Sequence, residues 1–263
     1  MQTTPFNHQL SIVIPVHDEQ DCIPLLVKAI DDALPSVLNY EILVVDDCSQ
    51  DNTWQTLVKL TQQYSRLRIL QHTHNAGQSA AVITGVKAAR HPWIATLDGD
   101  GQNNPADIPK LIDTLLQQPN QQKAYVIAGH RVSRQDSWLK KLSSRIANKV
   151  RGYILKDNCP DSGCGIKLFP RDPFLALPHF NHIHRFIPAM FYALGVSTIN
   201  VPVQHHHREH GRSKYGLNNR LWVGISDMIG VVWLRKRPFH VTGIQTYQQP
   251  VTQQEVTHEH LSQ

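Results

Sequence analysis

The chain has 263 residues, of which 41% are hydrophobic, and it carries a formal net charge of +5. This length suits one domain with an appendage and is short for two domains, and the hydrophobic content is enough to bury a substantial core. The four cysteines (Cys22, Cys48, Cys159 and Cys164) lack the spacing of a disulfide framework, and residues 1–9 lack the basic start and apolar run of a signal peptide. We therefore expect a cytoplasmic protein with free thiols.

Apolar segments alternate with segments of helical periodicity through the first half of the chain. We predict strands at residues 10–15, 41–45, 67–71, 93–97 and 124–128, and helices at residues 22–33, 53–64, 78–89 and 105–116. Strands rich in Ile and Val, with a helix between each pair, are typical of a parallel sheet with right-handed crossovers. The sequence therefore predicts an α/β fold.

Acidic side chains follow three of the predicted strands. In parallel sheets ligands bind outside the carboxyl ends of the strands, and those ends share one edge. The acidic groups are therefore expected to converge on one rim. They are Asp18 and Glu19, which follow His17 after the first strand, Asp46 and Asp47 after the second, and Asp98 and Asp100 after the fourth.

Asp98 and Asp100 lie one residue apart where an apolar strand ends, and the carboxamide of Gln102 follows. Gly99 and Gly101 permit a turn that lets the carboxylates share one ion. Hard oxygen ligands on so short a spacing suit Mg²⁺ or Mn²⁺, which complete their shells with water and substrate phosphates. Asp and Gly are also common in turns that bind no metal, so this alternative stays open.

The positive charge is concentrated in two blocks. Residues 130–151 contain seven Lys or Arg against one Asp, and residues 208–240 contain seven against two acids. Such blocks indicate an anionic partner, such as nucleic acid, phospholipid headgroups or a phosphorylated lipid, although a solvated helix face has the same composition.

Seven segments in order resemble the inverting family 2 glycosyltransferases, and among them the dolichol- or polyprenyl-phosphate sugar synthases. They are SIVIPVHDE (11–19), ILVVDDCSQDNT (42–53), HNAGQSAAVITGVKAA (74–89), TLDGDGQNNP (96–105), AGHR (128–131), PDSGCGIKLFPR (160–171) and HHREHGRSKYG (206–216). The resemblance implies a GT-A fold, which is a Rossmann-like and mostly parallel sheet flanked by helices. It also implies a nucleotide-sugar donor (GDP-mannose or a UDP-sugar), Mg²⁺ or Mn²⁺, and a polyprenyl or dolichyl phosphate acceptor in a membrane.

The resemblance also assigns the donor site. The residues that it implies for the nucleotide-sugar are Pro15, Val16, Glu19, Asp46, Asp47 and Asp98. Asp98, Asp100 and Gln102 are the implied metal site, with Asp98 acting partly through the ribose or a water. The family usually has Tyr-Asn before the glutamate, whereas this chain has His17-Asp18, so the choice of base is open.

A lipid phosphate is largely ionised near neutral pH, so its oxygen needs no strong general base to attack the sugar. Stabilising the departing diphosphate is the harder task, and we expect a single displacement with inversion. Cations are needed where two anions meet, and Arg131, Arg212 and Lys214 are the candidates. Asp161 resembles the family's proposed base, so Asp161, Asp100 and Arg131 form the expected catalytic set. His184 resembles a motif residue near the sugar and is a further candidate for the acceptor phosphate, although a buried structural histidine is the commoner outcome.

Residues 221–234 are apolar apart from Ser226 and Asp227. A helix of this length rises about 21 Å, which is less than the roughly 30 Å of a bilayer core. We expect it to lie in the membrane interface instead, or else to be an ordinary core or dimer helix. The expected membrane contacts are Trp222, Trp233, Arg235, Lys236 and Arg237.

These interpretations divide the chain into four parts. Residues 1–9 are expected to be a flexible N-terminus, 10–216 a GT-A domain, 217–243 an amphipathic membrane-proximal helix and 244–263 a disordered tail. The protein is then a peripheral enzyme on the inner, cytoplasmic face of the membrane, on anionic lipid and with a possible small membrane-protein anchor.

Three other functions fit parts of the sequence. A nucleotidyltransferase also uses carboxylates and Mg²⁺, but it would need a basic, glycine-rich loop after the first strand. A nucleic-acid-binding protein would explain the basic blocks, but the aromatic residues there lack the density of a stacking surface, so no nucleic-acid partner is expected. A zinc site would need closely paired ligands, which Cys159 and Cys164 do not provide.

Overall fold

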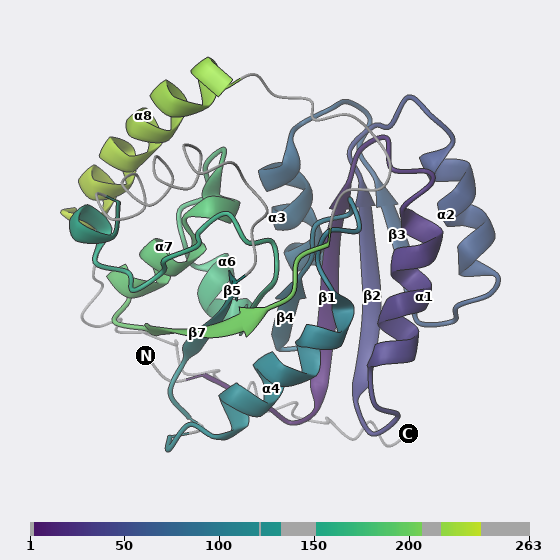
Figure 1. Ribbon diagram of the computed structural model, residues 1–263, viewed down its shortest axis with the longest axis horizontal. Helices are drawn as coiled ribbons and strands as arrows, with labels where there is room; N and C mark the ends of the chain where they lie inside the picture. The colour runs from purple at the N-terminus through teal and green to yellow at the C-terminus, as the bar shows by residue number, and fades with distance from the viewer. Residues whose placement is uncertain (1–2, 121, 133–150, 207–216, 238–263) are drawn as a thin grey trace, which may run out of the picture.

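The computed structural model describes residues 3–120, 122–132, 151–206 and 217–237. Within them a seven-stranded sheet carries helices on both faces (Figure 1). The order across the sheet is β3-β2-β1-β4-β6-β5-β7. The strands are β1 (Gln9–Val16), β2 (Asn39–Asp46), β3 (Leu67–Gln71), β4 (Trp93–Thr96), β5 (Tyr125–Arg131), β6 (Lys167–Pro170) and β7 (Ser197–Val203).

The predicted strands of the first half are all present, and the sheet is mostly parallel, as predicted. β6 runs antiparallel to both β4 and β5, whereas the other neighbouring pairs are parallel. β6 and β7 were not predicted from the sequence, because short apolar runs such as that of β6 carry too little periodicity to be identified. The antiparallel insertion places the residues just before β6 at the rim formed by the carboxyl ends of β4 and β5.

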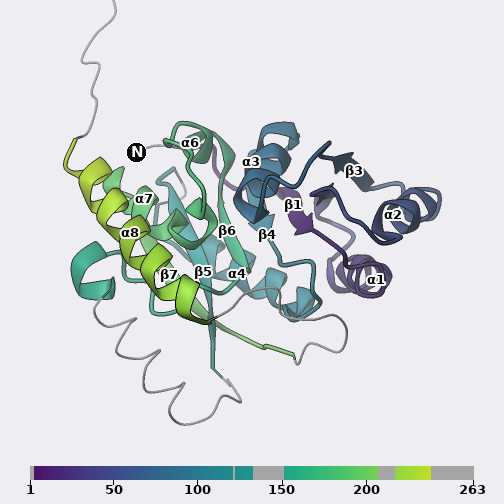
Figure 2. The same ribbon diagram turned by 90° about the horizontal axis from the view of Figure 1, so that it is seen from above.

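Helices cover each face of the sheet around a separate hydrophobic cluster. One face carries α1 (Ile23–Ala33), α2 (Thr53–Thr61) and α4 (Ile108–Leu116). The other carries α3 (Gln78–Ala88), α6 (Arg171–Leu175), α7 (Ile187–Ala193) and α8 (Leu217–Arg235). Figure 2 shows α8 over α7, at the opposite end of the molecule from α1 and α2.

The sequence explains why these elements pack closely. β1 and β2 are buried along nearly their whole length, as continuous apolar runs in a sheet covered on both faces should be. α3 approaches β1 at Gly85, where an added Cβ would lie 2.4 Å from Val13 Cγ1. A side chain at position 85 would therefore push the helix off the sheet.

Three contacts link the N-terminal segment to the domain. Phe6 is buried and contacts Trp93 edge to face. The Trp93 indole donates to the carbonyl of Thr4, and the Thr3 N–H donates to the carbonyl of Gln122. One aromatic side chain can supply enough buried area to anchor a short segment, and the flexibility expected for residues 1–9 stays a prediction.

Two boundaries differ from the expected ones. The helix expected at residues 105–116 begins as a 3₁₀ turn, η1 (Pro105–Asp107), because Asn104 Oδ1 accepts the N–H of Ala106 before the α-helix starts at Ile108. The C-terminal helix was expected over residues 217–243. It is α8, which ends at Arg235. No described helix combines the length and the apolar character needed to cross a membrane. The tail expected at residues 244–263 lies outside the described residues.

Candidate active site

The loop after β4 brings two carboxylates close together. Asn103 Oδ1 accepts the N–H of Asp98 at 2.9 Å and closes a turn over residues 98–103. Gly101 has φ +72°, and the carboxylate of Asp100 accepts the N–H of Gln102 at 3.2 Å. The predicted glycine turn is therefore present. Asn103, which the sequence analysis did not select, is the residue that closes it.

Burial and charge repulsion disfavour the ionised form of Asp98. Burial is the larger cause, and together with the neighbouring charge of Asp100 it raises the pKa of the Asp98 carboxyl to about 6. The positive charges of Lys167 and Arg131 and a hydrogen bond from Gln78 act in the opposite direction. A cation between the two carboxylates would relieve their repulsion, so this pair fits a divalent metal.

Further ligands for such a metal would come from amide oxygen and substrate. The Gln102 side-chain amide donates to the His206 carbonyl at 3.4 Å, and its oxygen has no hydrogen bond to another described residue. Among the described residues, no three His, Cys, Asp or Glu side chains are grouped closely enough to hold a metal ion. Two carboxylates and an amide suit a metal that takes water and phosphate oxygens as its remaining ligands.

Pro15 and Val16 form the floor beneath this loop. An added Cβ at Gly99 would lie 2.5 Å from Val16 Cγ1 and 2.9 Å from the Pro15 carbonyl. The end of β1 is thus in direct contact with the loop after β4. These two residues were predicted to line the nucleotide pocket, and they lie at the expected edge of the sheet.

Asp46 and Asp47 bond to the protein itself. Asp46 is fully buried, and its oxygens accept from Ser49 and from the Gln71 amide. Asp47 accepts from His72 Nδ1 at 2.7 Å and from the backbone N–H groups of Ala76 and Gly77 at 2.8 and 2.7 Å. Both carboxylates hold the surrounding loops, and their predicted contact with the nucleotide stays a prediction.

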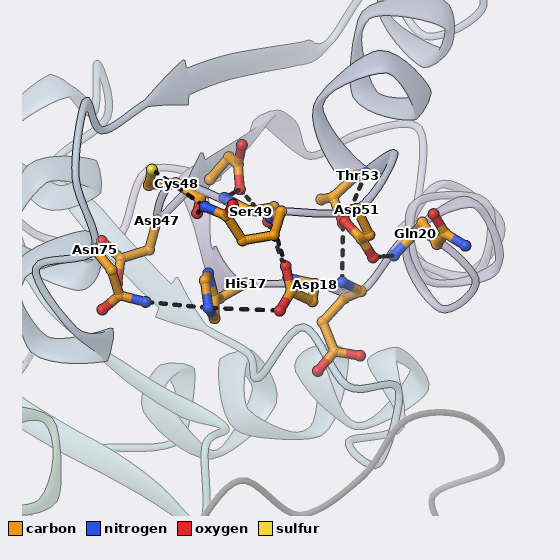
Figure 3. A network of polar contacts seen from close by, with 12 residues as sticks. His17, Asp18, Gln20, Asp47, Cys48, Ser49, Asp51, Thr53 and Asn75 are labelled. Atoms are coloured by element: carbon orange, nitrogen blue, oxygen red, sulfur yellow. Dashed lines mark hydrogen bonds and ion pairs between the residues drawn. The ribbon is translucent and has the colours of Figure 1, made fainter.

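The loops after β1 and β2 are cross-linked around His17 and Asp18. Figure 3 shows His17 between Asn75 and Asp18, with Nε2 lying 3.1 Å from the Asn75 amide nitrogen and 3.6 Å from Asp18 Oδ2. Asp18 has φ +54°, and its Oδ1 accepts the N–H of Gln50 at 2.7 Å. The hydroxyl of Ser49 accepts the N–H of Asp18 at 2.9 Å.

This cross-linked rim continues to the start of two helices. The N–H of Glu19 donates to Thr53 Oγ1 at 2.9 Å, at the first residue of α2. The Glu19 carbonyl accepts the N–H groups of Cys22 and Ile23, where α1 begins. His17 and Asp18, which replace the usual Tyr-Asn pair, thus lie in an ordered part of the rim.

Arg131 and Asp161 form a two-pronged ion pair. Arg131 Nε and Nη2 donate to the two oxygens of Asp161 at 2.7 and 2.6 Å, and the Arg131 backbone N–H adds a bond of 3.2 Å. Burial lowers the pKa of Arg131, but the Asp161 carboxylate outweighs it and the net shift is upward. From the sequence, Arg131 was expected to bind the acceptor phosphate and Asp161 to resemble the family's base. The structure shows that these two side chains bind each other directly. They lie close to Asp98, which is one of the charges that raise the pKa of Arg131.

His184 lies in the 3₁₀ turn η2 (Ile183–Arg185), and its Nδ1 is 2.7 Å from Ser79 Oγ in α3. Burial, followed by the charge of Lys167, lowers the pKa of His184 to about 3. The imidazole is thus neutral at physiological pH, so it offers a hydrogen bond but no positive charge to an acceptor phosphate.

Several residues of this site were not selected from the sequence. Position 165 has no room for a side chain, because a Cβ added to Gly165 would lie 2.2 Å from Asp98 Oδ2. Lys167 is buried, and its ammonium donates to the Cys164 carbonyl. Gln78, the first residue of α3, donates to Asp98 Oδ1 at 2.8 Å. All three lie in segments that carry the family resemblance, but their contacts join parts of the chain far apart in the sequence, so the sequence did not indicate those contacts.

The side chains of three residues predicted to contact phosphate or membrane lie outside the part of the chain that the structure describes. Arg212 and Lys214 lie outside the described residues, and Trp222 lies in α8 with a side chain that is also outside them. None of the four cysteines forms a disulfide, as predicted.

Comparison with known proteins identifies the family of this chain. The family model described as glycosyl transferase family 2 matches residues 11–177. Dodecaprenyl-phosphate galacturonate synthase of Rhizobium johnstonii is 34% identical over 246 residues, which cover 89% of this chain and 70% of the relative. Undecaprenyl-phosphate 4-deoxy-4-formamido-L-arabinose transferase of Edwardsiella ictaluri is 35% identical over 211 residues, covering 79% of this chain but only 63% of that relative.

Solved structures share the fold. Glucosyl-3-phosphoglycerate synthase of Mycobacterium tuberculosis in complex with Mg²⁺ and UDP has a TM-score of 0.63 at 15% identity, covering 87% of this chain and 79% of that one. The same enzyme with Mn²⁺, UDP and glucosyl-3-phosphoglycerate also has a TM-score of 0.63, at 16% identity, covering 87% and 80%. The predicted GT-A-like fold is confirmed, and the chain belongs to glycosyl transferase family 2, as a glycosyltransferase.

Proposed function

We propose that this glycosyltransferase moves a sugar from a nucleotide-sugar donor to a polyprenyl phosphate. The observation that carries the proposal is the pair Asp98 and Asp100 on a glycine turn at the rim where Arg131 and Asp161 also lie. Both relatives described above are named for polyprenyl-phosphate chemistry. Family membership leaves the nucleotidyltransferase and nucleic-acid alternatives without support.

In the reaction, an oxygen of the lipid phosphate attacks the anomeric carbon while the bond from that carbon to the nucleotide diphosphate breaks. The products are an inverted polyprenyl-phospho-sugar and a nucleoside diphosphate. No proton needs to leave the attacking oxygen, because a phosphomonoester is largely doubly ionised above its second pKa of about 6. Asp161, which is held by Arg131, therefore orients the reacting groups instead of acting as an obligatory base.

The chain's own residues hold and orient the reacting groups. Asp100 and the oxygen of Gln102 would hold the Mg²⁺ or Mn²⁺ with Asp98 behind them, and such an ion would supply positive charge to the leaving diphosphate. Arg131 offers a guanidinium at the same rim, and its bond to Asp161 fixes its orientation. Positioning of this kind contributes much of the rate of a displacement reaction.

We also propose that the enzyme works peripherally on the cytoplasmic face of the membrane, on anionic lipid, with α8 in the interface. Ile225, Ile229 and Trp233 are exposed at four-residue spacing, and Arg237 lies over the Trp233 ring at 5.0 Å. Arg235 was expected to contact the membrane. Its guanidinium instead donates to the Leu155 carbonyl and stacks on Tyr192. Arg235 thus holds α8 to the domain, which leaves Lys236 and Arg237 for the headgroups.

A donor panel tests the function. Purified protein is incubated with undecaprenyl phosphate, Mn²⁺ or Mg²⁺, and one of four donors: GDP-mannose, UDP-glucose, UDP-galacturonic acid or UDP-4-deoxy-4-formamido-L-arabinose. We expect one donor to dominate in nucleoside diphosphate release, EDTA to stop release, and Asp100→Ala to lower turnover by about 100-fold or more. Turnover that survives EDTA would contradict the metal assignment. Release of pyrophosphate, or of no product with any donor, would contradict the proposed reaction.

A further inference from the structure

Asp98 is held in place from outside its own loop. Among the described residues, the only hydrogen bond to its carboxylate comes from the amide of Gln78, at 2.8 Å. Other groups that act on it are the Cα of Gly165, the negative charge of Asp100 and the positive charges of Lys167 and Arg131. Lys167 and Arg131 attract this carboxylate through their charge, whereas among the described residues Gln78 supplies the directional hydrogen bond, so the orientation of the carboxylate depends on Gln78.

Gln78 can act in this way because its backbone is fixed. It is the first residue of α3 and follows Gly77, which has φ +89°. Asp47 binds the N–H groups of Ala76 and Gly77. His72, which bonds to Asp47, also reaches Thr84 farther along α3 at 2.9 Å. The start of α3 is therefore tied to the end of β2, and Gln78 extends that connection to Asp98.

We propose that Gln78 is a positioning residue that holds the Asp98 carboxylate in the orientation needed beside the metal and the donor. The proposal rests on the proposed function, since it assumes that Asp98 and Asp100 serve a metal and a nucleotide diphosphate. Gln78 touches neither the metal nor the substrate in this role. Groups that hydrogen-bond to metal-binding carboxylates typically contribute 10- to 100-fold to metal affinity or activity.

Gln78 is an exposed residue, so removal of its side chain should leave the fold intact. Two variants separate the possible roles. Gln78→Ala removes the donor, whereas Gln78→Glu replaces it with a carboxylate that faces Asp98 and repels it. Gln55→Ala, at an exposed position in the first turn of α2, is the matched control.

The first experiment measures the affinity of the protein for Mn²⁺ by electron paramagnetic resonance. It is carried out in the presence of UDP and, separately, of GDP. We expect Gln78→Ala to weaken Mn²⁺ binding and to lower kcat by about 10-fold, with the KM for the donor nearly unchanged. Gln78→Glu should be impaired at least as strongly, and Gln55→Ala should match the wild type. Tighter Mn²⁺ binding in Gln78→Glu would instead make residue 78 a metal ligand and overturn the proposal.

The second measurement needs neither metal nor substrate. A crystal structure of metal-free Gln78→Ala should show the Asp98 side chain rotated or in more than one conformer. An unmoved Asp98 carboxylate, or wild-type Mn²⁺ affinity and kcat in Gln78→Ala, would overturn the proposal while leaving the proposed function intact. A wild-type protein that binds Mn²⁺ with neither nucleotide would overturn both.

Discussion

Gly165 illustrates how tightly single residues are constrained in this site. The residue lies just before β6, and its Cα faces both Asp98 and Asn103. An added Cβ would be 2.2 Å from Asp98 Oδ2 and 2.6 Å from Asn103 Oδ1. Both of these groups belong to the turn that presents the carboxylates, so a methyl group at position 165 would move the turn itself.

We therefore predict that Gly165→Ala lowers turnover by about 100-fold, because a displacement of about 1 Å in a positioning group has an effect of that size. The measurement is nucleoside diphosphate release with the preferred donor, alongside a thermal melt that checks folding. Gly152→Ala is the control, since an added Cβ at Gly152 meets no atom within 4 Å. Full activity in Gly165→Ala would show that the turn tolerates the displacement.

At the scale of elements, the N-terminus of α3 depends on Asp47. The carboxylate is almost fully buried and accepts three hydrogen bonds, from His72, Ala76 and Gly77. These bonds join the end of β2 to the turn that starts α3. The next two residues, Gln78 and Ser79, contact Asp98 and His184.

Replacing Asp47 by alanine should thus destabilise the fold and not merely weaken donor binding. Two backbone N–H groups and one imidazole would lose their acceptor, and each such loss costs about 1–3 kcal/mol, so we expect a decrease on the order of 3 kcal/mol in the free energy of unfolding. Urea denaturation followed by circular dichroism gives this value. Asp113→Ala, at an exposed position of α4, should change stability by less than about 0.5 kcal/mol. Unchanged stability with a raised KM would favour the nucleotide role predicted from the sequence.

The whole molecule is asymmetric, with α8 at one end and α1 and α2 at the other (Figures 1 and 2). The side chain of Trp233 is 55% exposed on α8, and that of Val37 is 72% exposed in the loop between α1 and β2. If α8 rests on the membrane, only the first of these residues meets lipid.

Trp233→Glu should accordingly reduce binding to anionic liposomes by at least about 10-fold, because it removes the burial of a large apolar side chain and adds a negative charge next to negative lipid. Co-sedimentation with vesicles of phosphatidylglycerol and phosphatidylcholine measures the effect. Val37→Glu makes the same kind of change at the far end and should bind as the wild type does. Equal losses in both variants would point to a general charge effect instead of an α8 interface.

The sequence by itself determined the first five strands and the helices between them. Each strand is a run of Ile, Val or other apolar residues long enough to identify, and each helix shows its own periodicity. It also determined the acidic rim, since the carboxyl ends of parallel strands share one edge whatever the details of packing. The glycines around Asp100 were sufficient to predict the turn, because their effect on the backbone is local.

Only the tertiary structure decided which of these groups act on one another. The insertion of antiparallel β6 between β4 and β5 brings Asp161 to Arg131 and Gly165 to Asp98. The engagement of Asp47 by the start of α3 likewise joins segments about thirty residues apart. Such contacts depend on strand order and on the path of the chain through space, which neighbouring residues do not encode, and they determine which side chains remain available to a ligand.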